Sequence, residues 1–402
     1  MVRLRSKVIA LVVALILSQV TVNNGYSSFV LSDGITYFPD EAWIATDPEE
    51  QNMSNYTLTQ MMQFIEDSGS NVRGLVITRN GYIVKEAYWN YNTENTTRHI
   101  FSCTKSFTGA LIGIAIKEGF IDNVSQRMID FFPNRTIDNM DARKEAITLE
   151  HLLTMTHGLD WNEWNNSYSD PENMYNRMFL QSGDPVQFFL DLPTAYDPGT
   201  HWVYTTGASH MLSAIIQEAT GMTTRAFAQD YLFDPLNMTI GGWATDNQGI
   251  NNGGTLLYVT PRAMTKLGLL YLNNGTWNGR EIMTEEYVTQ SSTPYVNADL
   301  LAPEYGYQWW VDSEQGVFSA MGSEGQYIHV VPDYSIVMSM TASFDNMEED
   351  INEEILEYVL NSIFEGPEPN DEPFIPIISI AVVVLVAAIG FLYRQRMLSK
   401  RA

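Results

Sequence analysis

The chain has 402 residues, of which 45% are hydrophobic, so it can bury the core of one large domain or of two ordinary ones. Asp and Glu outnumber Lys and Arg by 48 to 22, which gives a formal net charge of −26. Phosphate binding needs clustered positive side chains, so this balance argues against nucleic acid as a partner.

Both ends of the chain carry features of membrane targeting. Three basic residues precede the short apolar run 8–17, which is typical of a secretory signal. Because no clean cleavage site follows, we expect residues 1–26 to be either a signal peptide or an N-terminal anchor. Residues 374–393 are apolar over about one bilayer thickness, and four basic residues follow in 394–402. These features predict a single-pass protein of the cell membrane with a cytoplasmic tail and an extracellular domain at 27–364.

Two further features fit an exported domain. Cys103 is the single cysteine, so no internal disulfide can form, and we expect it to pack inside the protein. Acceptor sequences for N-linked sugar predict a glycoprotein in a host that glycosylates. They occur at Asn52, Asn55, Asn95, Asn123, Asn134, Asn165, Asn237 and Asn274.

The first half of the predicted domain begins with strands and becomes helical. Residues 71–89 predict two strands joined by a type I′ turn at Asn80-Gly81. "HIFSCTKSFTGALIGIAIKEG" (99–119) predicts a helix entering a hydrophobic core. Residues 121–290 are mostly helical in pattern, and Thr260-Pro261 marks the start of one helix.

Strand signals return beyond residue 300. A meander is predicted, with strands at 307–311, 317–321, 326–331 and 335–341. A closing helix follows at 346–364, and the acidic, Pro-rich residues 365–373 predict a stalk. Strands from both ends of the domain therefore predict an α+β fold: one antiparallel sheet flanked by helices, beside a helical lobe. A ligand cleft is expected between lobe and sheet.

Ser102 and Lys105 begin the predicted buried helix and are the candidate catalytic pair. Three residues apart on a helix, they share a face. The positive end of the helix dipole and burial both lower the pKa of Lys105, and a neutral amine beside a hydroxyl can generate a nucleophile. The backbone N–H of Ser102 at the helix start is a candidate donor to a developing oxyanion.

Five segments in family order resemble the serine β-lactamase and penicillin-binding-protein family, most closely the esterases and 6-aminohexanoate-dimer hydrolases of its class C-like branch. They are "HIFSCTKSFTGALIGIAIKEGFID", "ITLEHLLTMTHGLDW", "DPGTHWVYTTGASHMLSAIIQEATG", "GGTLLYVTPRAMTKLGLLYLNNGTWNG" and "GSEGQYIHVVPDYSIVMSM". The resemblance covers roughly residues 40–363 and implies a β-lactamase/transpeptidase-like fold. It implies Ser102 as the acylated nucleophile, Lys105 as its base, and Tyr204 as a proton relay whose pKa Lys105 lowers. No metal or organic cofactor is implied.

The sequence departs from the family pattern in two motifs. The third motif reads Ala320-Met321-Gly322, without the basic side chain that helps fix a substrate carboxylate in β-lactamases and cell-wall peptidases. Gly322 is expected to let the strand approach a substrate, and the N–H of Ser323 to be the second oxyanion donor. Thr206 stands where Asn or Ser is common and is a further substrate-binding candidate. The departures favour an ester or amide substrate that lacks this carboxylate.

Other candidates lie in "MTHGLDWNEW". His157 is expected at the cleft, in a rim or structural role, and Asp160, Trp161 and Trp164 line the pocket or belong to the core. Neither Gly-x-Ser-x-Gly nor His-Glu-x-x-His occurs, so an α/β-hydrolase elbow and a zinc peptidase are not indicated. The prediction is a membrane-anchored extracytoplasmic serine hydrolase acting on a small ester or amide. The alternatives are a non-catalytic ligand-binding protein on the same scaffold, a β-lactamase or D-Ala-D-Ala peptidase, and acyl transfer to an acceptor other than water.

Overall fold

The computed structural model describes residues 37–40, 42–298, 301–344 and 350–363. The predicted N-terminal signal or anchor, stalk, transmembrane segment and basic tail lie outside these residues. Within the described ranges, no helix has the length and apolar character needed to cross a membrane.

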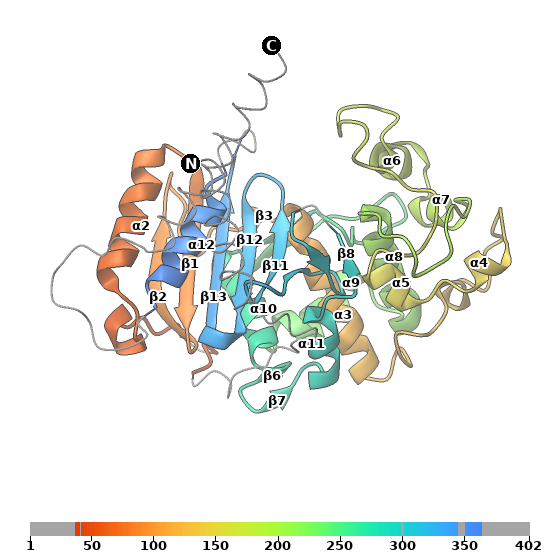
Figure 1. Ribbon diagram of the computed structural model, residues 1–402. Helices are drawn as coiled ribbons and strands as arrows, with labels where there is room; N and C mark the ends of the chain where they lie inside the picture. Colours follow the sequence, from red (N-terminus) through yellow and green to blue (C-terminus); the bar gives the residue numbers. More distant parts are fainter. Residues whose placement is uncertain (1–36, 41, 299–300, 345–349, 364–402) are drawn as a thin grey trace, which may run out of the picture. The chain divides into compact units, whose positions relative to one another are not determined.

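One antiparallel sheet of eight strands organises the domain, in the order β2-β1-β13-β12-β11-β10-β9-β8 (Figure 1). The strands that come first and last along the chain, β1 and β13, are neighbours in the sheet. Leu75 lies opposite Met340, and Ile77 lies opposite Met338. This pairing confirms the predicted sheet built from both ends of the domain. The strands are β1 (Val72–Arg79), β2 (Tyr82–Tyr88), β8 (Val296–Asn297), β9 (Glu304–Tyr305), β10 (Trp310–Asp312), β11 (Val317–Gly322), β12 (Gln326–Val331) and β13 (Ile336–Ala342).

The β1–β2 hairpin forms where the sequence predicts it. Asn80 has φ 54° and Gly81 has φ 90°, and a type I′ turn requires positive φ at both central residues. The predicted strand at 307–311 is wrong in its first half, because Gln308 adopts φ 62° and interrupts the extended backbone. The Gln308 side chain instead donates to Leu153 O at 2.8 Å, a contact with the helical lobe that local sequence does not encode.

Alternating residues of β12 face two helical layers. A Cβ built on Gly268 of α10 (Pro261–Leu272) would lie 3.2 Å from Ile328 Cγ2, so this glycine allows the helix to pack closely on the sheet. On the opposite face, His329 Nε2 lies 2.8 Å from Oδ1 of Asn352, the first residue of α12 (Asn352–Asn361). In Figure 1, α12 crosses in front of the sheet and α10 lies behind it. The two-residue period of the strand therefore produces a three-layer arrangement.

The start of α10 is as predicted, with the Thr260 hydroxyl accepting from Ala263 N and Pro261 in the first turn. The region 121–290 is helical but more broken than its pattern suggests, and it contains short strands. Its other elements are η3 (Met128–Phe131), α4 (Ala142–Glu145), α5 (Leu149–Leu153), α6 (Met174–Asn176), η4 (Arg177–Gln181), α7 (Pro185–Leu190), α8 (Thr206–Thr220), α9 (Thr224–Ala228), η5 (Gln229–Phe233), β4 (Ile240–Trp243), β5 (Leu257–Val259), β6 (Thr276–Trp277), β7 (Arg280–Glu281) and α11 (Glu285–Ser292). Outside this region lie η1 (Pro48–Gln51), α2 (Asn55–Ser68), β3 (Arg98–His99) and η6 (Pro332–Tyr334).

The predicted buried helix is α3 (Thr104–Lys117), preceded by the turn η2 (Phe101–Cys103). Every residue from 104 to 115 is buried, and two hydroxyls anchor the helix to its surroundings. Ser106 Oγ donates to Gln308 O, and Thr108 Oγ1 donates to Gly253 O, both at 2.7 Å. Cys103 is fully buried and its thiol donates to Gln326 O, so the prediction that it packs inside is confirmed. Contacts on the sheet side and the lobe side thus fix the orientation of α3.

Candidate active site

The turn η2 and the first turn of α3 bring Ser102 and Lys105 together. Lys105 Nζ lies 3.1 Å from Ser102 Oγ. Lys105 is 2% exposed, whereas Ser102 is only partly buried. The pair therefore combines a hydroxyl that solvent can reach with an amine that is held out of water.

Two further atoms hold the Lys105 amine. Nζ lies 3.1 Å from Thr206 Oγ1, at the start of α8, and 2.9 Å from Gly254 O. A Cβ built on Gly254 would lie 2.6 Å from Thr206 Cγ2 and 3.3 Å from Nζ, so a side chain at this position would displace both groups. Gly254 is a site residue that sequence reasoning missed, because its contribution is a backbone carbonyl.

Burial lowers the pKa of Lys105 from 10.5 to about 8, although the neighbouring Glu163 and Cys103 oppose this change. A buried ammonium loses its hydration, so the protein favours the neutral amine. At pH 7 about a tenth of Lys105 is therefore neutral and can act as a base, far more than for a lysine with its ordinary pKa.

Tyr204 lies beside the pair, as the resemblance implies. Its ring centroid is 4.9 Å from Lys105 Nζ, and its hydroxyl is hydrogen-bonded to the Ser102 side chain. The ring stacks with Trp164, at 4.5 Å between centroids, and with Trp310, at 5.8 Å. This aromatic stack fixes the plane of the phenol at the nucleophile.

The expected lowering of the Tyr204 pKa by Lys105 is wrong. Burial raises the pKa of this phenol well above 10, and the negative charge of Glu163 raises it further, whereas its interaction with the Ser102 side chain only partly offsets these effects. Tyr204 therefore keeps its proton at neutral pH and can donate it.

Glu163 is the most prominent group that sequence reasoning missed. It is 1% exposed, and its Oε2 accepts from Thr206 N at 2.8 Å and from Trp161 Nε1 at 2.9 Å. Its Oε1 accepts from Thr206 Oγ1 at 2.7 Å and from Tyr168 OH at 2.9 Å. The carboxylate lies at the N-terminus of α8, where the helix dipole favours a negative charge. The sequence offers only an acid between two tryptophans, which does not reveal its hydrogen bonds to Thr206 or the effect of its charge on Lys105.

Gly322, the last residue of β11, is placed against the nucleophile turn. A Cβ built on it would lie 2.5 Å from Ile100 O and 3.1 Å from Ser102 N. The close approach that this glycine allows in the structure is to the backbone before Ser102. The expected approach to a substrate stays a prediction. Ser323 follows directly and is exposed, so its backbone begins beside the turn that holds Ser102.

The residue before the nucleophile has an unusual backbone. Phe101 adopts φ 45°, a conformation that costs a bulky residue about 1–3 kcal/mol and persists only where its surroundings enforce it. The Phe101 ring packs on His99, with 3.9 Å between ring centroids. Packing thus holds a strained turn that presents Ser102.

His157 does not lie at the cleft rim, so of the two roles expected for it the structural one is confirmed. It is fully buried, its Nδ1 accepts from Leu159 N at 3.0 Å, and its Nε2 bonds Thr205 Oγ1 at 3.0 Å. Burial lowers its pKa to about 3, so the ring is neutral. His157 ties its loop to Thr205, the residue that precedes α8.

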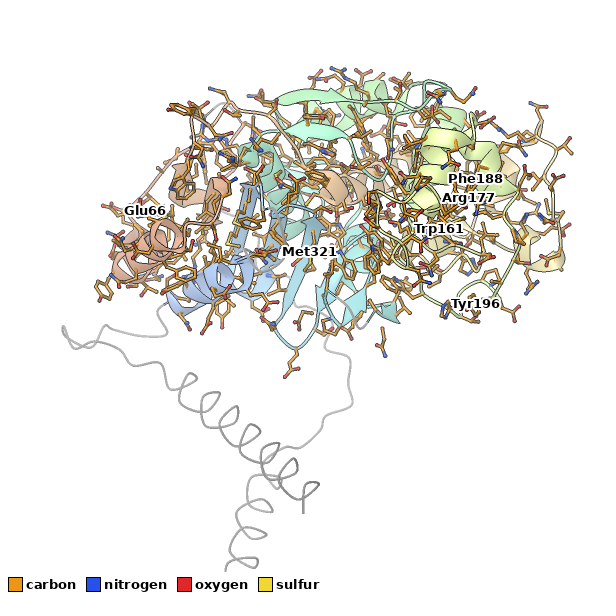
Figure 2. The ribbon with its side chains drawn as sticks, turned by 90° about the horizontal axis from the view of Figure 1, so that it is seen from above. Glu66, Trp161, Arg177, Phe188, Tyr196 and Met321 are labelled. Carbon is orange, nitrogen blue, oxygen red and sulfur yellow. The ribbon has the colours of Figure 1, made fainter. Side chains whose placement is uncertain are left out.

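The neighbouring candidates separate into three environments. Trp161 is buried in the core, Trp164 is 42% exposed over Tyr204, and Asp160 is exposed. Figure 2 shows Met321 on the sheet and Trp161 on the helical lobe. Met321 is half-buried and packs against the cluster that contains Tyr204 and Trp310. An aromatic and thioether surface therefore borders Ser102.

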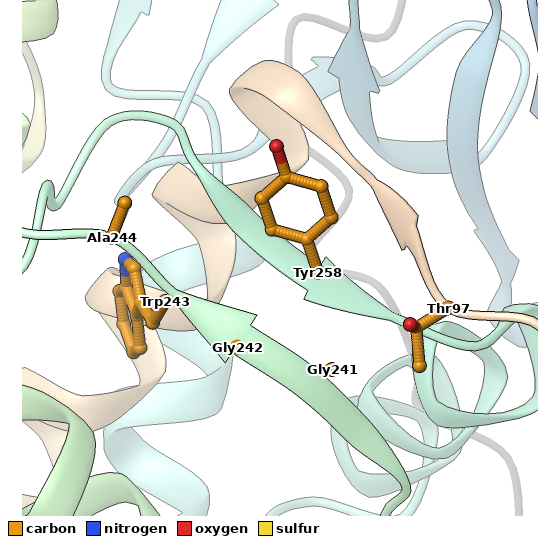
Figure 3. A pocket seen from close by; sticks show the side chains of 6 residues that line it. All are labelled: Thr97, Gly241, Gly242, Trp243, Ala244 and Tyr258. Carbon is orange, nitrogen blue, oxygen red and sulfur yellow. The ribbon is translucent and has the colours of Figure 1, made fainter.

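A hollow of about 420 Å³ lies elsewhere, on the small sheet formed by β3, β5 and β4 (Figure 3). It is lined by Thr97, Gly241, Gly242, Trp243, Ala244 and Tyr258, none of which is a candidate catalytic residue. We place the active site at Ser102, because the reactive groups converge there. In the part of the chain that the structure describes, no group of three His, Cys, Asp or Glu side chains is placed to hold a metal ion.

Comparison with known proteins identifies the family and the fold. Residues 61–359 match the family model described as Beta-lactamase. A 6-aminohexanoate-dimer hydrolase from Paenarthrobacter ureafaciens is 24% identical over 298 residues, covering 68% of this chain and 73% of that protein. EstCE1, described as a hydrolase with promiscuous acyltransferase activity, superposes with a TM-score of 0.64 at 16% identity, covering 76% of this chain and 98% of that one. A penicillin-binding protein from Bacillus halodurans superposes with a TM-score of 0.60 at 18% identity, covering 74% of this chain and 99% of that one. These structures confirm the β-lactamase/transpeptidase-like fold.

Proposed function

The chain belongs to the β-lactamase family and is a serine hydrolase, and from this premise we propose that Ser102 cleaves an uncharged ester or amide through an acyl-enzyme. The observation that carries the proposal is the 3.1 Å contact between Lys105 Nζ and Ser102 Oγ, made by an amine whose pKa burial lowers to about 8. A base of this kind beside a hydroxyl is the arrangement that nucleophilic catalysis needs.

In the acylation step, Ser102 Oγ attacks the substrate carbonyl carbon and its proton passes to the neutral Lys105 amine. The carbonyl oxygen becomes negative, and the backbone N–H groups of Ser102 and Ser323 are the proposed donors that stabilise it. The bond to the leaving group then breaks. Tyr204, which keeps its proton, donates it to the leaving oxygen or nitrogen and is reprotonated from Lys105. A water molecule attacks the acyl group through the same groups in reverse order.

The surroundings of Ser102 support an uncharged substrate. Ala320 is 1% exposed, and the half-buried Met321 follows it, so this part of β11 presents apolar groups. Trp164 adds an exposed aromatic face over Tyr204. An apolar acyl or leaving group would be accommodated here better than a carboxylate, which would lose its hydration without gaining a cation from the third motif. This favours an ester or amide over the alternatives of a β-lactam or a D-Ala-D-Ala peptide.

The proposal extends to location: an exported domain tethered by residues 374–393. Its support is the apolar run with its basic tail, together with the surface position of the glycosylation sequences. Seven of the eight sequon asparagines are exposed, and they are Asn52, Asn55, Asn95, Asn123, Asn134, Asn165 and Asn237. Treatment of intact cells with a glycosidase and with a protease, followed by isolation of the membrane fraction, tests this arrangement. A domain protected from both would contradict it.

The activity is tested with the full chain in detergent and p-nitrophenyl butyrate as substrate, with nitrocefin assayed in parallel. We expect turnover of the ester that is lost in Ser102→Ala, and no turnover of nitrocefin. A fluorophosphonate probe should label the wild type at Ser102 and leave the variant unlabelled. A folded protein that neither turns over ester nor reacts with the probe would instead indicate the ligand-binding alternative. Preference for nitrocefin would indicate a β-lactamase, and ester formation with an added alcohol would reveal acyl transfer.

A further inference from the structure

We propose that Glu163 is a positioning residue that sets the direction of the hydrogen bonds at Lys105, acting through the Thr206 hydroxyl. The inference rests on the proposed function, because it concerns how Lys105 serves as the base for Ser102. Glu163 is a buried acid that the sequence analysis did not select, and none of the predicted site residues has this positioning role.

Hydrogen-bond donors surround the Glu163 carboxylate. Thr206 N and Trp161 Nε1 can only donate, and both bond Oε2, at 2.8 and 2.9 Å. Tyr168 OH bonds Oε1 at 2.9 Å. A carboxylate surrounded in this way accepts hydrogen bonds from every side, and it has no hydrogen to give.

The Thr206 hydroxyl carries one hydrogen, and its direction is determined by Glu163. Because Glu163 Oε1 lies 2.7 Å from Thr206 Oγ1 and only accepts, that hydrogen points to Glu163. The other side of Thr206 Oγ1 therefore presents only lone pairs. These face Lys105 Nζ at 3.1 Å.

The neighbours of the Lys105 amine determine where its lone pair points. A neutral lysine has two N–H hydrogens and one lone pair. Gly254 O, at 2.9 Å, is a carbonyl and can only accept, and Thr206 Oγ1 is restricted to accepting by Glu163. These two acceptors take both hydrogens, so the lone pair is directed at the third neighbour, Ser102 Oγ. Ser102 then donates its proton to Lys105, which is the direction that general-base catalysis requires.

Replacing Glu163 by glutamine would reverse this polarity with little change in shape. The amide oxygen must occupy the place of Oε2, because Thr206 N and Trp161 Nε1 both donate there. The amide NH₂ then takes the place of Oε1 and donates to Thr206 Oγ1. The Thr206 hydrogen turns toward Lys105 Nζ and occupies the lone pair, so Lys105 can no longer accept the proton of Ser102.

Glu163→Gln changes activity in opposite directions depending on whether Glu163 acts through its charge or through the hydrogen bond of Thr206. The titratable groups that face Lys105 are Glu163, Cys103 and Tyr204, and the charge of Glu163 raises the pKa of Lys105. If Glu163 acted only through its charge, Glu163→Gln would lower this pKa and increase the activity below about pH 8. If it acts through Thr206, the activity falls at every pH.

The experiment compares wild type, Glu163→Gln, Thr206→Val and the double variant in full-length protein. We expect kcat for p-nitrophenyl butyrate to fall about 100-fold in Glu163→Gln with little change in KM, in the range for loss of a general base. Thr206→Val should lose only several-fold, because it removes the hydroxyl that would block the lone pair. The double variant should therefore resemble Thr206→Val and be more active than Glu163→Gln, a rescue that a structural defect would not show. Glu150→Gln is the matched control, since this lobe acid bonds Tyr307 OH and contacts neither Lys105 nor Thr206.

Thermal unfolding and fluorophosphonate labelling accompany the kinetics. A Glu163→Gln protein that keeps kcat within about threefold of wild type, or that gains activity below pH 8, would overturn the inference. Additive losses in the double variant would overturn it as well. If the wild type shows Ser102-dependent labelling and Glu163→Gln labels equally fast, only this inference fails. If the wild type itself does not label or turn over, the proposed function fails and the role of Glu163 fails with it.

Discussion

Replacing Lys105 by methionine should remove activity and make the stability difference from wild type depend on pH. Burial lowers the pKa of Lys105 from 10.5 to about 8, so the folded protein binds its proton less tightly than the unfolded chain does. Between about pH 8 and pH 10.5 the unfolded state therefore holds more protons at this site than the folded state. The free energy of unfolding of the wild type must rise with pH across this window.

The magnitude follows from the two pKa values. Each pH unit of difference corresponds to about 1.4 kcal/mol, so a decrease from 10.5 to about 8 costs the fold ~3 kcal/mol at pH 7. Methionine carries no charge and avoids this cost. It also leaves the buried Gly254 carbonyl without the Lys105 donor, which costs about 2 kcal/mol. The variant should thus be about 1 kcal/mol more stable than wild type at pH 7 and about 2 kcal/mol less stable near pH 10.5.

Urea unfolding of both proteins at pH 7, 8, 9 and 10 measures this difference. Lys117→Met is the matched control, because Lys117 ends the same helix but is partly exposed and bonds Glu118. A constant difference for Lys105→Met would refute the reasoning, since it would mean that folding leaves the affinity of Lys105 for protons unchanged. Ester turnover by Lys105→Met at the wild-type rate would refute the role of Lys105 as base.

Three further predictions concern the residues around the pair. Tyr204→Phe should lower kcat by about 10²–10⁴-fold, because the proton donor is lost. The melting temperature should stay unchanged, because the aromatic stack survives. Steady-state kinetics measures kcat, and a thermal melt measures the melting temperature. Gly322→Ala should cost about 1–3 kcal/mol and lower kcat/KM, because its Cβ would push on the turn before Ser102. Gly242→Ala, which has open space around the added Cβ, is its control, and equal behaviour of the two variants would contradict the close approach. His157→Phe should cost about 2 kcal/mol in denaturant unfolding, because the buried Leu159 N–H loses its acceptor while Thr205 keeps its bond to Val203 O, yet the folded enzyme should keep its KM. A large rise in KM would return His157 to the substrate site.

Local sequence was sufficient wherever a short segment determines its own conformation. The hairpin follows from Asn80-Gly81, because few other residues accept two consecutive positive φ values. The start of α10 follows from Thr260-Pro261, where a hydroxyl caps the helix and proline fits the first turn. The Ser102–Lys105 pair follows from helical spacing, since residues three apart share a face. The sheet built from both ends of the domain was predicted because strand signals occur there and each needs a partner.

Only the tertiary structure decided which groups surround that pair. Lys105 is contacted by Thr206 and by Gly254 O, which are 101 and 149 residues away along the chain. Glu163 comes from a separate loop, and its charge together with burial reverses the expected direction of the Tyr204 pKa shift. His157 was misplaced for the same reason, because its sequence context marks a loop near the site but not the burial that engages both ring nitrogens. The sequence by itself determined the candidate nucleophile, its candidate base and the strands and helix that carry them, since these depend on neighbours along the chain. Packing between distant segments determined the hydrogen-bond directions and proton affinities, since burial and long-range contacts exist only once the chain has folded.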